Sequence, residues 1–166
     1  MSTGRTIPVG GGGGGYPPHA QYRSTTAIST TASFPLDNTI PQISEGADTG
    51  ASVTIVVEDA ASDIRIDVSI SLASSGASQH AGFYVFRGAE ADAIGGVFKH
   101  FGASVADIVA FSFTVPAAST GSKTFSLRYG IQAGTGTTLY LLTLAGTAYH
   151  GATQTINLSA TELPPV

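Results

Sequence analysis

The sequence contains no cysteine and no tryptophan, and it has few charged residues. Without cysteine the chain can form neither disulfides nor zinc–thiolate sites, and it has no cysteine nucleophile. Charged residues make up 11% of the chain, compared with about 25% in typical soluble domains. Lys99 and Lys123 are its two lysines. A surface of Ser, Thr, Gly and Ala loses little side-chain entropy when it packs, which favours permanent assembly; the alternative is compositional drift in a high-GC genome.

Positive charge and long apolar runs are also scarce. The formal net charge of −4 opposes nucleic-acid binding, which needs Lys and Arg to displace counterions from phosphates. No apolar run reaches the roughly 20 residues that span a bilayer, and the N-terminal residues around Arg5 lack the apolar region of a secretory signal. We therefore expect no nucleic-acid partner, no membrane insertion, and a protein that stays soluble in a cytoplasm until it assembles.

Residues 1–24 have the composition of an arm rather than of a folded segment. Six consecutive glycines, Gly10 to Gly15, carry high backbone entropy, and nothing nearby can bury enough apolar surface to offset it. We expect this arm to be disordered when alone and to anchor the chain on neighbouring subunits; the alternative is a disordered linker. The candidate anchoring residues are Arg5, Tyr16, Pro17, Pro18, Tyr22 and Arg23.

The remaining residues, 25–166, show the period-two pattern of β-strands. Apolar and polar residues alternate over 63–72, 109–115, 125–131 and 156–160, which is typical of antiparallel strands with one face in water. Short apolar runs at 53–57, 83–86 and 139–144 predict strands buried on both faces, at a sheet centre or at a subunit interface. No amphipathic helix is present, and residues 90–94 and 103–108 could form short helical turns at most.

These patterns predict an all-β domain. About eight strands without alternating helices indicate an antiparallel β-sandwich. Among sandwiches the jelly roll is the best candidate, because viral capsid domains favour it; that step is an analogy at the level of the fold.

No motif predicts catalysis, a metal site or a cofactor. The four histidines, at 19, 80, 100 and 150, lack metal-ligand spacing; sites on a threefold axis remain an alternative. Asp63 and Asp67 share a strand face with Arg65 between them, which indicates surface ion pairs rather than the carboxylate pair of a glycosidase. The chain has no G-x-S-x-G elbow and no P-loop. We therefore expect a protein that is not an enzyme, with a carbohydrate-active enzyme as a remote alternative.

Three ordered motifs carry a resemblance to a known family. The chain reads Asp37-Asn38-Thr39-Ile40-Pro41-Gln42 and then Glu45-Gly46, which resembles the opening D-(D/N)-T-I-P-Q-x-x-E-G of a β-sandwich module common in virion proteins of tailed bacteriophages. In that family a later strand reads F-x-x-R-x-G, matched here by Phe125 to Gly130 with Arg128. The close, (L/I)-x-(A/V)-x-E-(L/I), is matched by Leu158 to Leu163 with Glu162.

The resemblance covers roughly Ser33 to Leu163 and implies structure and attachment rather than chemistry. It implies a fibre or spike module, commonly trimeric, located in the virion and joined to other virion proteins through the arm. Contact with a host surface polysaccharide is a further expectation, for which Tyr149 and His150 are the candidate glycan-contact residues, because exposed aromatic loop residues can stack on sugar rings. The alternative is a head decoration protein that stabilises the capsid.

Overall fold

The computed structural model describes residues 5–9, 17–35, 37–74, 79–102, 106–132, 138–144, 147–148 and 155–165. These residues form strands, turns and loops, with no helix among them. In chain order the strands are β1 (Arg5–Val9), β2 (His19–Ser24), β3 (Ile28–Thr30), β4 (Ser33–Phe34), β5 (Ala47–Val57), β6 (Asp63–Ser74), β7 (Gln79–Arg87), β8 (Gly95–Phe101), β9 (Ala106–Pro116), β10 (Gly121–Gln132), β11 (Leu139–Leu141), β12 (Thr143–Leu144), β13 (Thr147–Ala148) and β14 (Ile156–Leu163).

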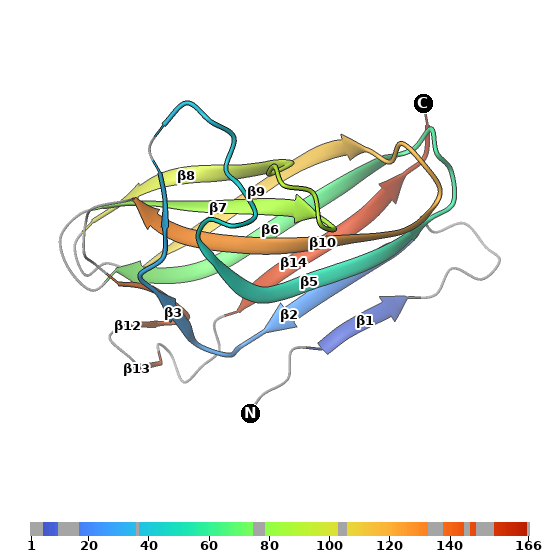
Figure 1. The fold of residues 1–166 in the computed structure, drawn as a ribbon. Helices are drawn as coiled ribbons and strands as arrows, with labels where there is room; N and C mark the ends of the chain where they lie inside the picture. Colours follow the sequence, from blue (N-terminus) through green and yellow to red (C-terminus); the bar gives the residue numbers. More distant parts are fainter. Residues whose placement is uncertain are drawn as a thin grey trace.

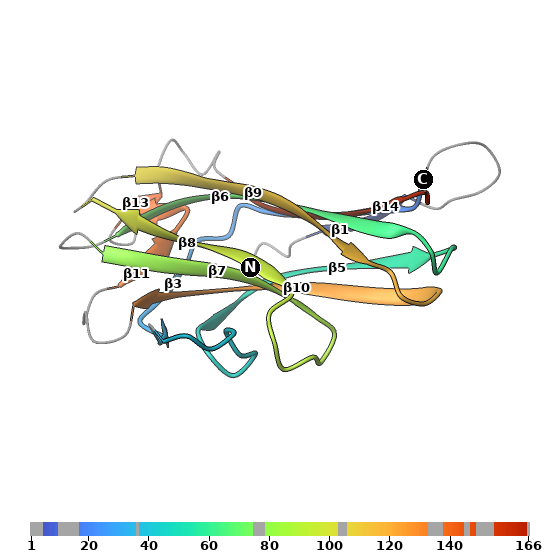
Figure 2. The ribbon, with the colours of Figure 1, turned by 90° about the horizontal axis from the view of Figure 1, so that it is seen from above.

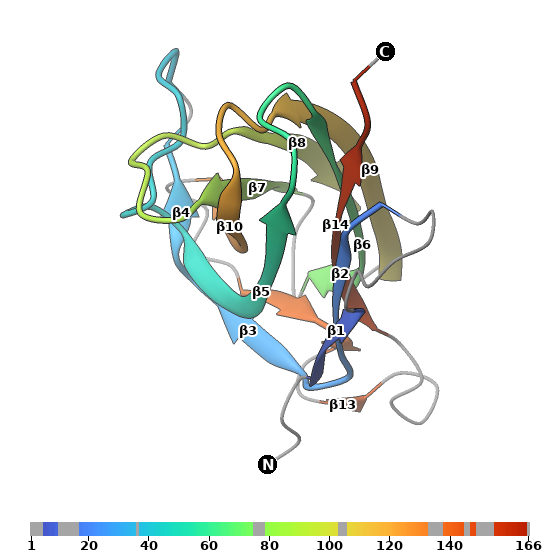
Figure 3. The same ribbon diagram turned by 90° about the vertical axis from the view of Figure 1, so that its right-hand side faces the viewer.

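The long strands form two sheets that pack face to face (Figure 1 and Figure 2). In the first sheet the order across the strands is β2-β14-β6-β9, with β1 beside β2. In the second it is β5-β10-β7-β8. Figure 3 shows the two sheets end-on, curled around one core. Each sheet places a late strand between two earlier ones: β14 lies between β2 and β6, and β10 lies between β5 and β7. This strand order is that of a jelly roll, which is built from two Greek keys. The predicted antiparallel β-sandwich is confirmed.

At two places in the first sheet, two separate strands lie end to end where a single long strand would otherwise run. β11 and β14 both pair antiparallel with β6, at residues 72–74 and 63–70 respectively. On their other side, β3 pairs with β11 and β2 pairs with β14. The chain therefore leaves the line of one strand after Leu142, whose amide still donates to the Ser71 carbonyl (3.0 Å), and rejoins that line at Ile156. β12 and β13 pair with each other within this excursion.

The core lies between the sheets, where the alternating apolar residues point. Along β6, the five residues from Ile64 to Leu72 at even positions are all buried, as the period-two pattern predicts. The run at 83–86 is buried on both faces as well, since Phe83, Val85 and Phe86 are fully buried. Within this chain the run at 53–57 is buried on one face, since Val53, Ile55 and Val57 are buried and Val56 is 59% exposed. Burial of its other face at a subunit interface stays a prediction.

The sheet begins earlier than the composition indicates. β2 lies inside the first sheet between β1 and β14, although the sequence places its residues in the arm. Its Ala20 and Ser24 are buried, so β2 contributes to the sandwich itself. The sequence does not reveal β2, because it follows a glycine-rich run and Tyr22 is the one large side chain with apolar surface among its six residues.

The structure also corrects the expected helical turns. Residues 90–94 contain bends and a bridge between Gln42 and Asp92, while residues 106–108 open β9 and residues 103–105 lie outside the described residues. β8 was not predicted, since its sequence, Gly95 to Phe101, mixes two glycines with Lys99 and His100. β8 is held in extended conformation by its pairing with β7 rather than by an alternating pattern of its own residues.

Candidate functional site

The opening motif forms a tightly bonded loop between β4 and β5. One Asp37 carboxylate oxygen accepts hydrogen bonds from the Thr39 amide (2.8 Å) and hydroxyl (2.5 Å). These bonds stabilise the charged form and lower the pKa of Asp37. Further along, the Gln42 amide donates to the Glu45 carboxylate (2.7 Å), and the Glu45 amide donates back to the Gln42 carbonyl (2.9 Å). The motif therefore specifies a loop whose side chains close on its own backbone.

The same loop is joined to the loop between β7 and β8. The Gln42 side chain donates to the Asp92 carboxylate (2.6 Å), and backbone bonds run from Ile43 to Ala91 (2.7 Å) and from Ala93 to Pro41 (2.9 Å). Figure 2 shows the two loops side by side below the second sheet. Residues 37–40 remain exposed at the surface of this pair, with Ile40 54% exposed. We call residues 37–46 and 88–94 the paired loops.

Arg128 of the second motif fixes the paired loops to β10. Its guanidinium donates to the backbone carbonyls of Glu45 (2.9 Å) and Gly46 (3.0 Å). A bidentate guanidinium holds two acceptors in a defined geometry, which an ammonium cannot do. The opening motif and the second motif, more than 80 residues apart in sequence, therefore form one structural unit.

The Phe34 ring occupies the space that side chains at Gly46 and Gly130 would need. This buried ring packs against Tyr84 with 4.8 Å between ring centroids. A Cβ atom added at Gly46 would lie 2.5 Å from this ring, and one at Gly130 would lie 2.9 Å from it. Gly46 also has a φ of +62°, a conformation that L side chains rarely adopt. The glycine that ends each motif therefore makes room for one aromatic ring beneath the paired loops.

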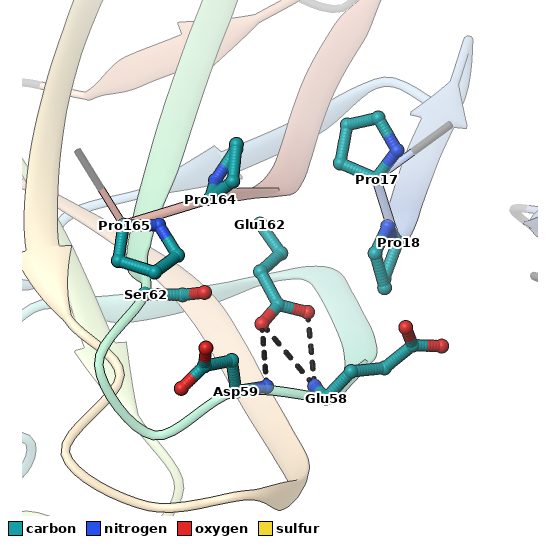
Figure 4. A pocket seen from close by; sticks show the side chains of 8 residues that line it. All are labelled: Pro17, Pro18, Glu58, Asp59, Ser62, Glu162, Pro164 and Pro165. Carbon is teal, nitrogen blue, oxygen red and sulfur yellow. Dashed lines mark hydrogen bonds between the residues drawn. The ribbon is translucent and has the colours of Figure 1, made fainter. Parts of the chain in front are cut away.

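Glu162 of the closing motif forms a second structural unit at the opposite end of the sheets. It occupies the inward face of β14 in line with Leu158 and Ala160, and is 3% exposed. Its carboxylate accepts bonds from the backbone amides of Glu58 (3.0 and 3.2 Å) and Asp59 (2.9 Å), as Figure 4 shows. An inward-facing carboxylate is tolerated here because the turn between β5 and β6 supplies the donors that a buried charge needs.

A hollow of about 390 Å³ lies beside Glu162. Pro17 and Pro18 border it where β2 begins, and Pro164 and Pro165 border it where β14 ends. The rest of its lining is formed by Glu58, Asp59, Ser62 and Glu162 (Figure 4). We call it the proline-rimmed hollow.

The other predicted arm residues lie at the first sheet. Tyr22 and Arg23 are in β2, opposite Leu158 and Asn157 of β14. Arg5 is the first residue of β1, and its backbone pairs with that of Arg23. Tyr16 and the glycan-contact candidates, Tyr149 and His150, lie outside the described residues.

The structure brings together two histidines that the sequence left apart. His80 of β7 and His100 of β8 are directly opposite in register, with ring centroids 4.9 Å apart. His80 also hydrogen-bonds the Gln132 side chain (3.0 Å) and stacks on Phe98. His19 hydrogen-bonds the Thr161 hydroxyl (2.8 Å) across β2 and β14. Within the described ranges no three His, Asp or Glu side chains are grouped to hold a metal ion.

The carboxylates of β6 lie on its outer face, as the alternation predicts. Arg65 bonds one oxygen of Asp67 through two nitrogens (2.8 and 2.9 Å). Asp63 and Asp67 are therefore separated by a residue that is paired with one of them, the arrangement of a surface ion pair.

β9 forms one edge of the first sheet. It pairs with β6, and no other described strand pairs with it. From Ile108 to Pro116 it carries no charged residue, and Ile108 is 61% exposed. At its start Lys99 bonds Asp107 (2.8 Å), which lowers the pKa of Asp107 chiefly through this hydrogen bond. Phe111 and Phe113, stacked with 6.2 Å between centroids, are only half-buried beside the core.

Comparison with known proteins gives a distant structural likeness. No protein-family model matches the chain, and no curated protein matches it. Among solved structures, the chain is similar to a protein in the crystal structure of the T13 IBDV viral particle, with 12% identity and a TM-score of 0.40. The match covers 96% of this chain and 41% of that chain. In the part of the chain that the structure describes, no helix is long and apolar enough to cross a membrane.

Proposed function

We propose that the chain is a structural virion protein, a fibre or spike module of a tailed phage or phage-like particle, built as a homo-oligomer. The observation that carries this proposal is the edge of β9, whose uncharged backbone row from Ile108 to Pro116 can pair with a strand of another chain. Monomeric sandwiches protect such edges with charges, bulges or covering loops. Lys99 protects the first residues of this one, and Arg87 donates to the Pro116 carbonyl at its other end (3.2 Å), which leaves the residues between them uncovered by charge.

The family resemblance supports the virion as the place of assembly. The residues that carry it have architectural roles: the opening motif and Arg128 hold the paired loops, and Glu162 holds the turn between β5 and β6. The exposed residues 37–40 then form a rigid surface at one face of the second sheet. A jelly roll is also the fold of many capsid and lectin domains, but fold alone does not decide function.

We propose a trimer in which β9 of one copy contacts a different surface of the next. Such head-to-tail contacts close into a ring when the rotation between copies allows it. The N-terminal residues would join the ring to other virion proteins, and the residues after β13, which include Tyr149 and His150, are the candidates for contact with a host polysaccharide.

The test is incorporation of truncated chains into particles. A deletion should end at residue 16, since β2 and the two prolines before it belong to the sandwich. Particles purified from producing host cells should contain the full chain and lack the chain without residues 1–16. Equal incorporation of both would contradict the anchor. Particles without the protein should adsorb poorly to host cells yet keep their heat resistance; loss of heat resistance instead would favour a head decoration protein.

A further inference from the structure

The proline-rimmed hollow has the charge of a site for a cation. Its lining includes the carboxylates of Glu58, Asp59 and Glu162 and, among the residues that the structure describes, no Lys, Arg or His. Two backbone amides offset part of the charge of Glu162. The other two carboxylates are exposed at the rim of the same hollow. The local potential is therefore negative, in a chain whose formal net charge is already −4.

Ser62 supplies an independent indication of a ligand. The residue is 2% exposed, and its backbone is bonded on both sides, to the Asp59 carbonyl (3.1 Å) and from the Ala117 amide (2.9 Å). Its hydroxyl, in contrast, makes no hydrogen bond to any residue that the structure describes. Figure 4 shows this hydroxyl directed into the hollow toward the Glu162 carboxylate. A buried hydroxyl without a partner is unfavourable, and a bound donor would relieve it.

The positions of the oxygens favour an ammonium group over a metal ion. In Figure 4 the Ser62 hydroxyl and the Asp59 carboxylate lie on the same side of Glu162, whereas the Glu58 carboxylate points the other way. This leaves two carboxylates and a hydroxyl, fewer than the 6–8 oxygen ligands that calcium takes. An ammonium group has three donors and needs only three acceptors. The proline rings at the rim offer apolar contact to an aliphatic stem.

We propose that the proline-rimmed hollow binds a primary ammonium group on an aliphatic stem, the chemistry of a lysine side chain on a partner protein. The ammonium donates to the Ser62 hydroxyl and to the carboxylates of Asp59 and Glu162, while the stem lies between Pro18 and Pro164. A free diamine shares this chemistry, so the experiment has one arm for each source. The proposal does not depend on the virion role.

The experiment is a titration of the isotope-labelled full chain, followed by NMR at the amides of Glu58, Asp59 and Ser62. The probes are Nα-acetyl-lysine amide for a protein side chain and 1,5-diaminopentane for a free amine. The neutral isostere Nα-acetyl-norleucine amide is the control. We expect saturable shifts with the lysine probe and none with norleucine. Saturation by the diamine at tenfold lower concentration would identify a free amine as the occupant. Absence of saturable shifts with both amines, or equal shifts with norleucine, would overturn the proposal.

Two matched variants test the assigned acceptors. The Asp59 carboxylate accepts a hydrogen bond from the Ala61 amide (2.8 Å), and Asp59→Asn removes the charge but keeps an oxygen for this bond. Asp48 accepts the same kind of bond from the Gly50 amide (2.8 Å) outside the hollow, so Asp48→Asn is the matched control. Asp59→Asn should weaken the lysine probe about tenfold, the usual effect of losing a hydrogen bond to a charged group, and Asp48→Asn should not. Equal binding by both variants would contradict the site.

Ser62→Ala separates binding from folding. It should weaken the lysine probe by a similar factor while leaving the melting temperature of the free protein unchanged or raised, because no internal bond is lost. A clearly lower melting temperature would show that the hydroxyl already has a structural partner, and the proposal would fail.

Discussion

Arg128 and Glu162 hold loops at two places in the sandwich, with opposite charges and in different surroundings. Arg128 is half-buried and donates to two carbonyls of the paired loops. Glu162 is almost fully buried and accepts from two amides of the turn between β5 and β6. Water still reaches the half-buried guanidinium of Arg128, whereas the carboxylate of Glu162 is almost completely removed from the surface. The same kind of contact should therefore contribute more to stability at Glu162 than at Arg128.

Replacing Glu162 should have the largest effect. Glu162→Ala removes the charged acceptor of two partly buried amide bonds, worth about 1.5–3 kcal/mol each, so we expect the free energy of unfolding to fall by about 4 kcal/mol. Urea unfolding measures it. Glu162→Gln keeps one acceptor oxygen and should lose about half as much. A loss below 1 kcal/mol for Glu162→Ala would show that the turn finds other acceptors.

Gly46→Ala tests the packing beneath the paired loops. The added Cβ would lie 2.5 Å from the Phe34 ring and 2.8 Å from the Tyr129 carbonyl, at a φ of +62°. Backbone strain and overpacking together should lower the free energy of unfolding by about 3 kcal/mol. Gly50 is the matched control, since its φ is +73° but no atom lies within 4 Å of an added Cβ. Gly50→Ala should cost about 1 kcal/mol, and equal losses would exclude a role for Phe34.

Arg128→Ala should destabilise less than Glu162→Ala. The two carbonyls it releases can bind water, so we expect a loss of about 2 kcal/mol. Amide hydrogen exchange should speed up at the paired loops, read at Ile43 and Ala93, and stay unchanged at Glu58 and Asp59. Arg128→Lys should behave like the alanine variant, because an ammonium cannot bond both carbonyls in the plane. Uniform exchange across the whole sandwich would contradict a local function for this residue.

Alkaline pH gives the smallest effect. Burial raises the pKa of Tyr129 from 10.0 to about 12. Its stabilising contribution is therefore complete below pH 10 and is lost as pH rises toward 12, with about 1 kcal/mol lost by pH 11. Tyr129→Phe should reduce this dependence, which urea unfolding at pH 9 to 11 measures. Burial also raises the pKa of Tyr84, so part of the dependence should remain. An unchanged slope in Tyr129→Phe would contradict the assignment.

The fold was largely predictable from the sequence, because alternation in strands such as β6 and β9 is strong and continuous. β2 and β8 were not predictable, since their apolar residues are few and their stability comes from pairing with β14 and β7. The motif residues could be singled out by resemblance. Their partners could not, because Arg128 and Glu45 meet only once β10 and β5 are paired. The proline-rimmed hollow gave no signal, since Pro17 and Pro165 come from the two ends of the chain.

We propose that this chain works by assembly through the edge of β9, and sedimentation velocity is the decisive experiment. We expect the full chain at micromolar concentration to sediment as a trimer. Ser112→Lys, at an exposed position of β9, should sediment as a folded monomer because a charge on an edge strand blocks pairing. Ser69→Lys, on the same outer face but in the central strand β6, should remain a trimer. A full chain that sediments as a monomer would contradict assembly through the edge of β9.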